Sequence, residues 1–184
     1  MLRNTATSWG ALAKNFHWIM AVLILVQITL GLLAVNWHLS PAKIQLFFWH
    51  KSLGVLILAL LAVRIAWRLA NATPALPADM PGWERSAARL SHALLYALLI
   101  LLPLTGWLVN SAANIPFRAF WLVPLPAIVE PNKSLAASFA RVHLGLVVFF
   151  AFVLTVHIAA ALRHHFVKRN TVLVRMLPER WTTP

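Results

Sequence analysis

Histidine is the residue type in this sequence that is best suited to do chemistry, and four of its eight copies have the spacing of metal ligands. His143 and His157 stand 14 residues apart in one apolar segment. On a helix this spacing puts the two rings roughly 21 Å apart along the axis and within about 40° of one face. Both rings then face the same interior, one in each half of a bilayer whose hydrocarbon core is about 30 Å thick.

Two further histidines supply partners at the same two depths. His17 opens the first apolar segment and His50 opens the second. Because successive membrane segments run in opposite directions, His17 lies level with His157, near the inner face, and His50 lies level with His143, near the outer face. The sequence therefore predicts two bis-histidine sites stacked across a membrane.

The chemistry of these pairs points to haem. Imidazoles in hydrocarbon are costly and indicate a functional site. Two imidazoles alone make a poor zinc site, but they suffice for iron that a porphyrin already holds. Six-coordinate iron has no open position, so the predicted chemistry is electron transfer. The chain has no cysteine, which excludes disulfides, c-type haem attachment and cysteine-ligated iron–sulfur clusters. A lone histidine at a helix end is more often an interfacial hydrogen-bonding residue, and we assign that role to His38 and His92.

Haem propionates need cations beside them, and several basic residues are close to the four histidines in sequence. The candidates are Lys51 and Arg141 for the outer haem, and Lys14 and Arg64 for the inner haem.

The neighbouring pair His164 and His165 suggests a quinone site at the inner interface, beside Arg163. Adjacent helical residues point about 100° apart, so one of the two rings faces the core, and His164 is the better placed. It would hydrogen-bond a quinone carbonyl or supply its proton. The alternative is a polar helix end whose cations complement the helix dipole.

The elements that must position these residues are four membrane-spanning helices. Hydrophobic residues make up 61% of the chain and charged residues 11%, against about 25% charged in an ordinary globular protein. Four apolar segments are long enough to span a bilayer. We expect an all-α integral membrane four-helix bundle, one di-haem domain over residues 1–184. The predicted helices cover about 17–35, 47–68, 88–110 and 139–165.

The connections between these helices differ in character. The first, Asn36–Leu46, is short and contains Pro41. The second, Leu69–Arg89, holds Pro74, Pro77 and Pro81, and is expected to be irregular. The third, Asn110–Ser138, is the longest, and within it Ile115–Val123 suits a short segment lying in the membrane interface. The N-terminus does not read as a signal peptide, since its apolar run is about as long as a span and no A-x-A-like site follows it.

The basic residues predict the orientation. Eleven lie on the side of the termini (Arg3, Lys14, Arg64, Arg68, Arg85, Arg89, Arg163, Lys168, Arg169, Arg175 and Arg180) and five on the other side (Lys43, Lys51, Arg118, Lys133 and Arg141). The positive-inside rule then places both termini in the cytoplasm of a bacterial inner membrane. The formal charge of +12 is therefore a sign of topology, and no nucleic-acid partner is expected.

The sequence resembles the bacterial cytochrome b561 family over nearly its whole length. The matching pieces are Phe16–Trp18, His50–Gly54, Leu-Pro-Leu-Thr-Gly in the third helix, Val142–Gly145, Val156–His165 and Asn170–Pro178. The resemblance implies a four-helix, quinone-linked cytochrome with two haem b groups, whose axial ligands would be His17, His50, His143 and His157. It also places His164 at the quinone pocket.

Members of that family include a superoxide oxidase, so the resemblance implies a membrane oxidoreductase that takes electrons from superoxide at the periplasmic side and reduces ubiquinone. Lys51 and Arg141 would attract a small anion to the outer face. The alternative is a haem-b anchor subunit that receives electrons from a periplasmic dehydrogenase or hydrogenase. A third possibility is a small transporter or channel whose histidines relay protons or bind metal.

Overall fold

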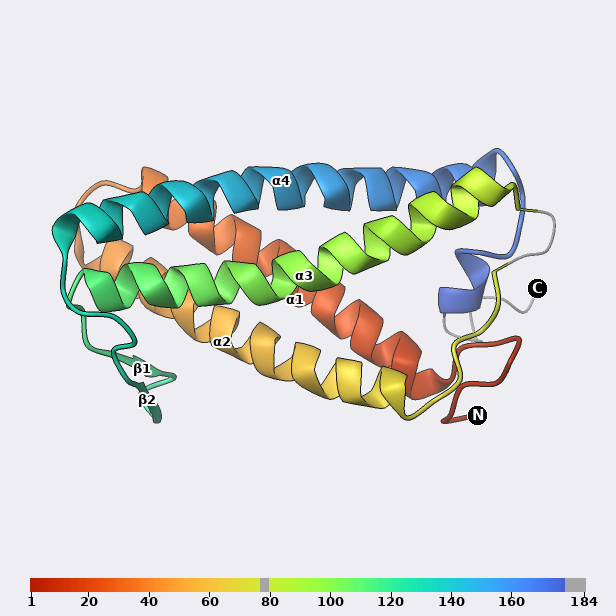
Figure 1. Cartoon of the computed structure of the whole chain (residues 1–184), viewed down its shortest axis with the longest axis horizontal. Helices are drawn as coiled ribbons and strands as arrows, with labels where there is room; N and C mark the ends of the chain where they lie inside the picture. Colours follow the sequence, from red (N-terminus) through yellow and green to blue (C-terminus); the bar gives the residue numbers. More distant parts are fainter. Residues whose placement is uncertain (77–79, 178–184) are drawn as a thin grey trace.

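Four long helices make up most of the computed structural model, which describes residues 1–76 and 80–177 (Figure 1). The remaining elements within the described ranges are a two-stranded β-hairpin and one turn of 3-10 helix. The bounds are α1 Ala11–Asn36, α2 Pro41–Leu69, α3 Gly82–Ala112, β1 Phe117–Ala119, β2 Val123–Leu125, α4 Lys133–Phe166 and η1 Val174–Met176. The predicted residues Pro77 and Arg180 lie outside the described ranges.

Each helix extends beyond its predicted apolar span. Pro41 does not interrupt the first connection but occupies the first turn of α2, where its missing N–H costs nothing. The described part of the second connection, residues 71–76 and 80–81, is irregular, and α3 starts directly after Pro81. Pro103 lies inside α3, as expected for a membrane helix. The additional turns carry polar residues such as Lys14, Lys43 and Lys133, so hydrophobicity located the spans but not the helix ends.

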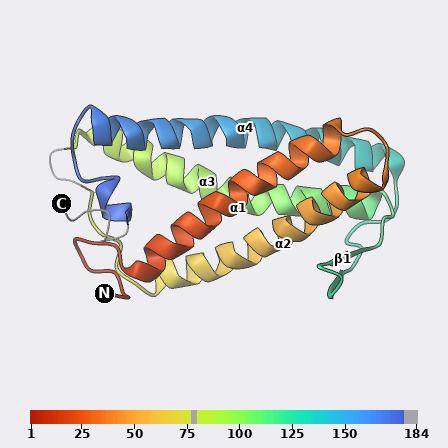
Figure 2. The same ribbon diagram turned by 180° about the vertical axis from the view of Figure 1, so that it is seen from behind.

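The helices pack as two antiparallel pairs, α1 with α2 and α3 with α4 (Figures 1 and 2). One buried cluster joins α1 to α2 through Met20, Ile57 and Leu61. A second joins α3 to α4 through Leu98, Phe150 and Val153. Half-buried side chains then connect the two pairs; Tyr96, for example, packs against the first cluster from α3.

The outside of the bundle is apolar. Large hydrophobic side chains such as Val22, Leu144 and Phe152 are exposed along its length. All four helices are long and apolar enough to cross a membrane. A soluble protein would not expose so much apolar surface, and lipid removes the cost. The prediction of an all-α membrane bundle is thus confirmed.

The β-hairpin lies at one end of the bundle, which we call the β-hairpin end. Its strands are antiparallel, with Phe117 opposite Leu125. At its tip Phe120 and Trp121 adopt left-handed backbone angles, which are uncommon for large residues. Two contacts hold them there: the Phe120 N–H donates to the buried Ser52 hydroxyl (3.1 Å), and Trp121 stacks on Phe48 with 3.9 Å between ring centres.

The N-terminus and the end of α4 lie at the opposite end, which we call the termini end (Figure 1). Here residues 167–177 follow α4 and turn back toward the start of α1. Lys14 donates to the Leu177 carbonyl (2.9 Å) and Trp18 to the Met176 carbonyl (2.8 Å). Arg175 donates to the Ala75 carbonyl (2.9 Å). This tail is therefore attached to the first turns of α1, next to His17.

Candidate functional site

The histidine pair at the β-hairpin end joins the two helix pairs. His50 comes from α2 and His143 from α4, and their ring centres are 6.5 Å apart with an interplanar angle of 83°. Both residues are half-buried. The structure thus brings together the two residues that the sequence pairs at the outer depth.

Both rings at this end are hydrogen-bonded through Nδ1. His50 Nδ1–H donates to the Gln27 carbonyl (3.1 Å). His143 Nδ1 lies 2.9 Å from the Thr105 hydroxyl oxygen. These bonds orient the rings through Nδ1, which is the usual arrangement around a metal-bound histidine, and the Gln27 amide nitrogen lies 3.5 Å from His50 Nε2. The Gln27 amide also donates to the His50 carbonyl (2.9 Å). Sequence reasoning missed both residues, although Gln27 is the most polar residue of its span and Thr105 belongs to the Leu-Pro-Leu-Thr-Gly motif.

Gly31 makes room for the His50 ring. A Cβ at this position would lie 2.9 Å from His50 Cε1, closer than real Cβ contacts allow. Only glycine permits this approach of α1 to the ring.

The pair at the termini end also joins the two helix pairs. His17 comes from α1 and His157 from α4, and their ring centres are again 6.5 Å apart, with an interplanar angle of 67°. The structure therefore also brings together the two histidines that the sequence pairs at the inner depth. The surroundings, however, are not those of the other pair.

His92 is exposed and lies beside the pair at the termini end, a neighbour that the sequence did not predict. Its ring centre lies 5.3 Å from that of His157. Its position at the start of an apolar run predicted its depth but not the helix face on which it lies. A cavity of about 350 Å³ adjoins this ring, lined by Ile65, Arg68, Arg89, His92, Ala93 and Tyr96.

Two arginines, Arg64 and Arg68, lie close to the histidine pair at the termini end. Arg64 Nη2 is 3.4 Å from His17 Nδ1, and Arg64 Nε donates to the Tyr96 hydroxyl (3.2 Å). The Arg68 guanidinium lies 5.6 Å from the centre of the Tyr96 ring. A cation therefore lies beside the His17 ring, whereas neutral oxygen atoms lie beside both histidine rings at the other end. Of the predicted propionate partners, Arg64 is the one that directly contacts a histidine ring.

The other predicted propionate partners contact protein groups. Lys51 donates to Asn110 Oδ1 (2.6 Å) and lies 5.5 Å from the centre of the Phe117 ring. Arg141 is exposed and donates to the Ser138 hydroxyl (3.1 Å). Lys14 donates to the tail, as described above. Within residues 1–76 and 80–177, Arg141 and Lys14 make no hydrogen bond to either histidine pair. Each lies within about one helical turn of its histidine, but its side chain contacts the groups just named.

Two of the three predicted quinone-site residues are engaged in an ion cluster around Glu84. This carboxylate is buried at the start of α3, 6% exposed, and accepts from Lys168 (2.7 Å) and Arg163 (3.1 Å). His164 Nε2 is 3.6 Å from Glu84, and its Nδ1 lies 2.8 Å from the Asn170 amide nitrogen. His164 is therefore buried in a helix-end cluster, while His165 stays half-buried against Phe166.

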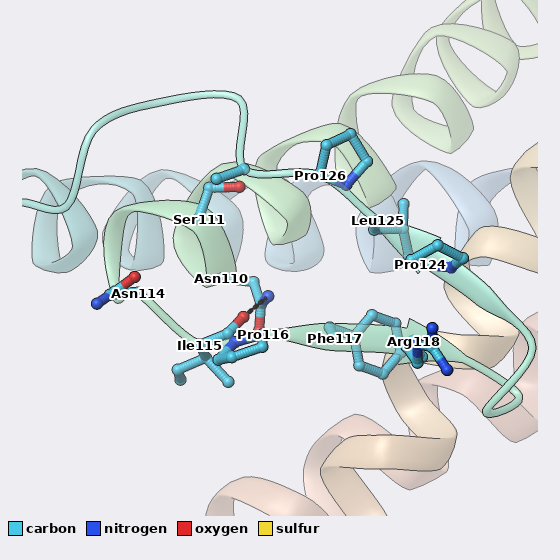
Figure 3. A pocket seen from close by; sticks show the side chains of 11 residues that line it. Asn110, Ser111, Asn114, Ile115, Pro116, Phe117, Arg118, Pro124, Leu125 and Pro126 are labelled. Carbon is cyan, nitrogen blue, oxygen red and sulfur yellow. Dashed lines mark hydrogen bonds between the residues drawn. The ribbon is translucent and has the colours of Figure 1, made fainter.

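A second cavity opens at the β-hairpin end, with a volume of about 530 Å³ (Figure 3). It lies between the end of α3 and the β-hairpin, and its lining includes Asn110, Ser111, Phe117 and Arg118. Asn110 links this cavity to Lys51, the residue after His50.

Comparison with known proteins identifies the class. The family described as prokaryotic cytochrome b561 matches residues 8–179. Cytochrome b561 homolog 2 of Escherichia coli (strain K12) is 30% identical over 95% of this chain and 93% of its own length. Cytochrome b561 homolog 1 of the same organism is 28% identical over 89% of this chain and 93% of its own length. A Yersinia pestis protein named probable superoxide oxidase CybB is 30% identical over 94% of this chain and 97% of its own length.

The fold and the matched residues define a multi-pass bacterial membrane protein of electron transfer. The chain belongs to the prokaryotic cytochrome b561 family, and this membership implies haem b.

The geometry of the histidine pairs fits such a cofactor. An imidazole nitrogen lies about 1.1 Å from its ring centre and bonds a metal at about 2.0–2.1 Å, so two rings flanking one metal have centres roughly 6 Å apart. A direct ring-to-ring hydrogen bond would bring the centres to roughly 5 Å. Both observed separations are 6.5 Å. Within the described residues no group of three or more histidine, aspartate or glutamate side chains is arranged to hold a metal ion.

Proposed function

We propose that the chain holds two haem b groups, one at each histidine pair, and passes electrons between the two faces of the membrane. His50 and His143 would ligate one iron, and His17 and His157 the other. The supporting observation is the repeated 6.5 Å separation at two depths, each time between residues of different helix pairs. The haems would supply reversible one-electron transfer.

The expected orientation puts the β-hairpin end at the periplasmic side and the termini in the cytoplasm. Support comes from the basic residues, eleven against five. A reporter fused to the C-terminus tests this orientation: a cytoplasmic reporter should be active there and an exported reporter inactive.

For the reaction we propose superoxide oxidation at the β-hairpin end and ubiquinone reduction at the termini end. Two superoxide ions each lose one electron and become O₂, while ubiquinone gains two electrons and two protons and becomes ubiquinol. Support comes from the name of the Yersinia pestis relative and from Lys51, whose charge beside His50 would attract a small anion.

The residues proposed at the quinone site are His164, Arg163 and His165. Since the first two are held by Glu84 and Asn170, the proposed contact with quinone falls mainly on His165. His165→Ala should slow reoxidation of the reduced haems by ubiquinone. The absorption spectrum of the haems and the haem content of the protein should not change. His164→Ala serves as the comparison.

Enzymatically generated superoxide tests the reaction. It should reduce the haems of the purified protein and then added ubiquinone, with two superoxide ions consumed per quinone, and superoxide dismutase should abolish both. The His143→Ala variant should be inactive. Superoxide consumption no faster than spontaneous dismutation would exclude this reaction while leaving the haem proposal intact.

A second candidate function is a haem anchor for a periplasmic dehydrogenase or hydrogenase. The observation in its favour is the apolar tip of the β-hairpin, where Trp121, Leu122 and Val123 are exposed. Such a patch suits a docking partner. In that case a soluble redox protein should co-purify with the chain, and replacing Trp121 and Leu122 by serine should release it.

A further inference from the structure

The Thr105 side chain makes an unusual set of contacts for a threonine in a membrane helix. Its hydroxyl donates within α3 to the carbonyls of Leu101 and Leu102, both at 2.9 Å. The same oxygen lies 2.9 Å from His143 Nδ1 on α4. Thr105 is buried, with 8% of its surface exposed.

The hydrogen count at this oxygen decides the direction of the bond to His143. A hydroxyl has one hydrogen and two acceptor positions. The hydrogen is shared between the two helix carbonyls, so the oxygen accepts from the histidine. His143 therefore carries its proton on Nδ1, and its Nε2 has a free lone pair directed away from Thr105.

We propose that Thr105 is a positioning residue for the haem at the β-hairpin end, which fixes the ligating tautomer of His143 and lowers the reduction potential of the iron. This proposal rests on the proposed function, in which His143 is an axial ligand. An acceptor on Nδ1–H makes the imidazole more basic, and a more basic ligand stabilises ferric over ferrous iron. Because the helix carbonyls fix the hydroxyl hydrogen, the acceptor is preorganised.

The substitutions Thr105→Val and Thr105→Ser separate this role from packing. Valine keeps the shape and removes the acceptor, while serine keeps the acceptor and removes the methyl group. A redox titration followed by the haem absorption bands gives the potential of each haem. Thr105→Val should shift the ferric–ferrous equilibrium of one haem roughly tenfold toward ferrous, about 59 mV for one electron. Thr105→Ser should stay close to wild type.

Thr29 provides a matched control. It lies on α1, is exposed, and donates to the carbonyl four residues back, that of Leu25 (2.9 Å). Thr29→Val should leave both potentials unchanged. Two haems with unchanged potentials in Thr105→Val would overturn the proposal, and so would equal shifts in the valine and serine variants.

Loss of haem gives an equally clear result. If Thr105→Val loses one haem and Thr105→Ser retains two, the hydroxyl positions the ligand and the proposal stands. Loss from both variants overturns it. If the wild-type protein binds no haem, the proposed function fails. The Thr105 contact is then tested by ¹⁵N NMR of the His143 ring, where protonated Nδ1 supports it and protonated Nε2 refutes it.

Discussion

The two ends of the bundle carry histidine pairs of the same separation in different surroundings. At the β-hairpin end both rings donate through Nδ1 to neutral acceptors, the Gln27 carbonyl and Thr105. At the termini end Arg64 lies against His17, and a third histidine, His92, lies against His157. Acceptors on Nδ1 favour ferric iron, whereas a nearby cation favours ferrous iron. The comparison predicts that the electron rests on the proposed haem at the termini end, which suits the proposed transfer from the periplasmic to the cytoplasmic side.

Removing one proposed axial ligand from each end should have the largest effect. His143→Ala should lose the haem at the β-hairpin end and keep most of the other, because its iron would have one protein ligand. His157→Ala should do the reverse. Haem content and absorption spectra of the purified variants check this. If both variants lose the same haem, the pairing is wrong.

A smaller but still selective effect is expected at Gly31. Gly31→Ala should push His50 aside and weaken haem retention at the β-hairpin end, because the new Cβ would lie 2.9 Å from its ring. The measurement is the rate of haem loss to a haem-scavenging protein. Gly82→Ala, where the new Cβ meets open space, is the control and should behave as wild type. Equal loss from both ends would argue against a local effect.

The contrast in charge is tested at Arg64. Arg64→Gln should lower the reduction potential of the haem at the termini end, because a cation beside its ligand is removed. The ferric–ferrous equilibrium of that haem should shift roughly tenfold toward ferric. Arg64→Lys keeps the charge and should recover most of the potential. A change confined to the other haem would contradict the assignment of this arginine.

The smallest effect should come from Glu84. Glu84→Gln removes the anion that Arg163 and Lys168 share, so the tail and α4 should be held less firmly to α3. We expect the melting temperature in detergent to fall by a few degrees, with both haem spectra unchanged. Loss of a haem would show that the cluster supports a ligand directly.

The sequence predicted the features that depend on periodicity and hydrophobicity. Those features are the four spans and the level of each paired histidine, since a 14-residue spacing determines both depth and face. It did not predict the third histidine at the termini end, because the face of α3 on which His92 lies depends on how α3 packs against α4.

Other contacts depend on residues far apart in the chain. Glu84 lies 79 residues from Arg163, so the cluster that occupies the predicted quinone residues had no local signal. Thr105 and Gln27 are visible in the sequence as polar residues in apolar runs, yet their hydrogen-bond partners come from other helices. The β-hairpin was also not predicted, since its tip depends on Ser52 and Phe48 of α2.

The haem content of the purified chain tests the central claim most directly. Protein from haem-replete cells should contain two haems b per chain, and reduction by dithionite should give the spectrum of six-coordinate, low-spin iron. One haem per chain, or a colourless protein, would contradict the account of two bis-histidine sites.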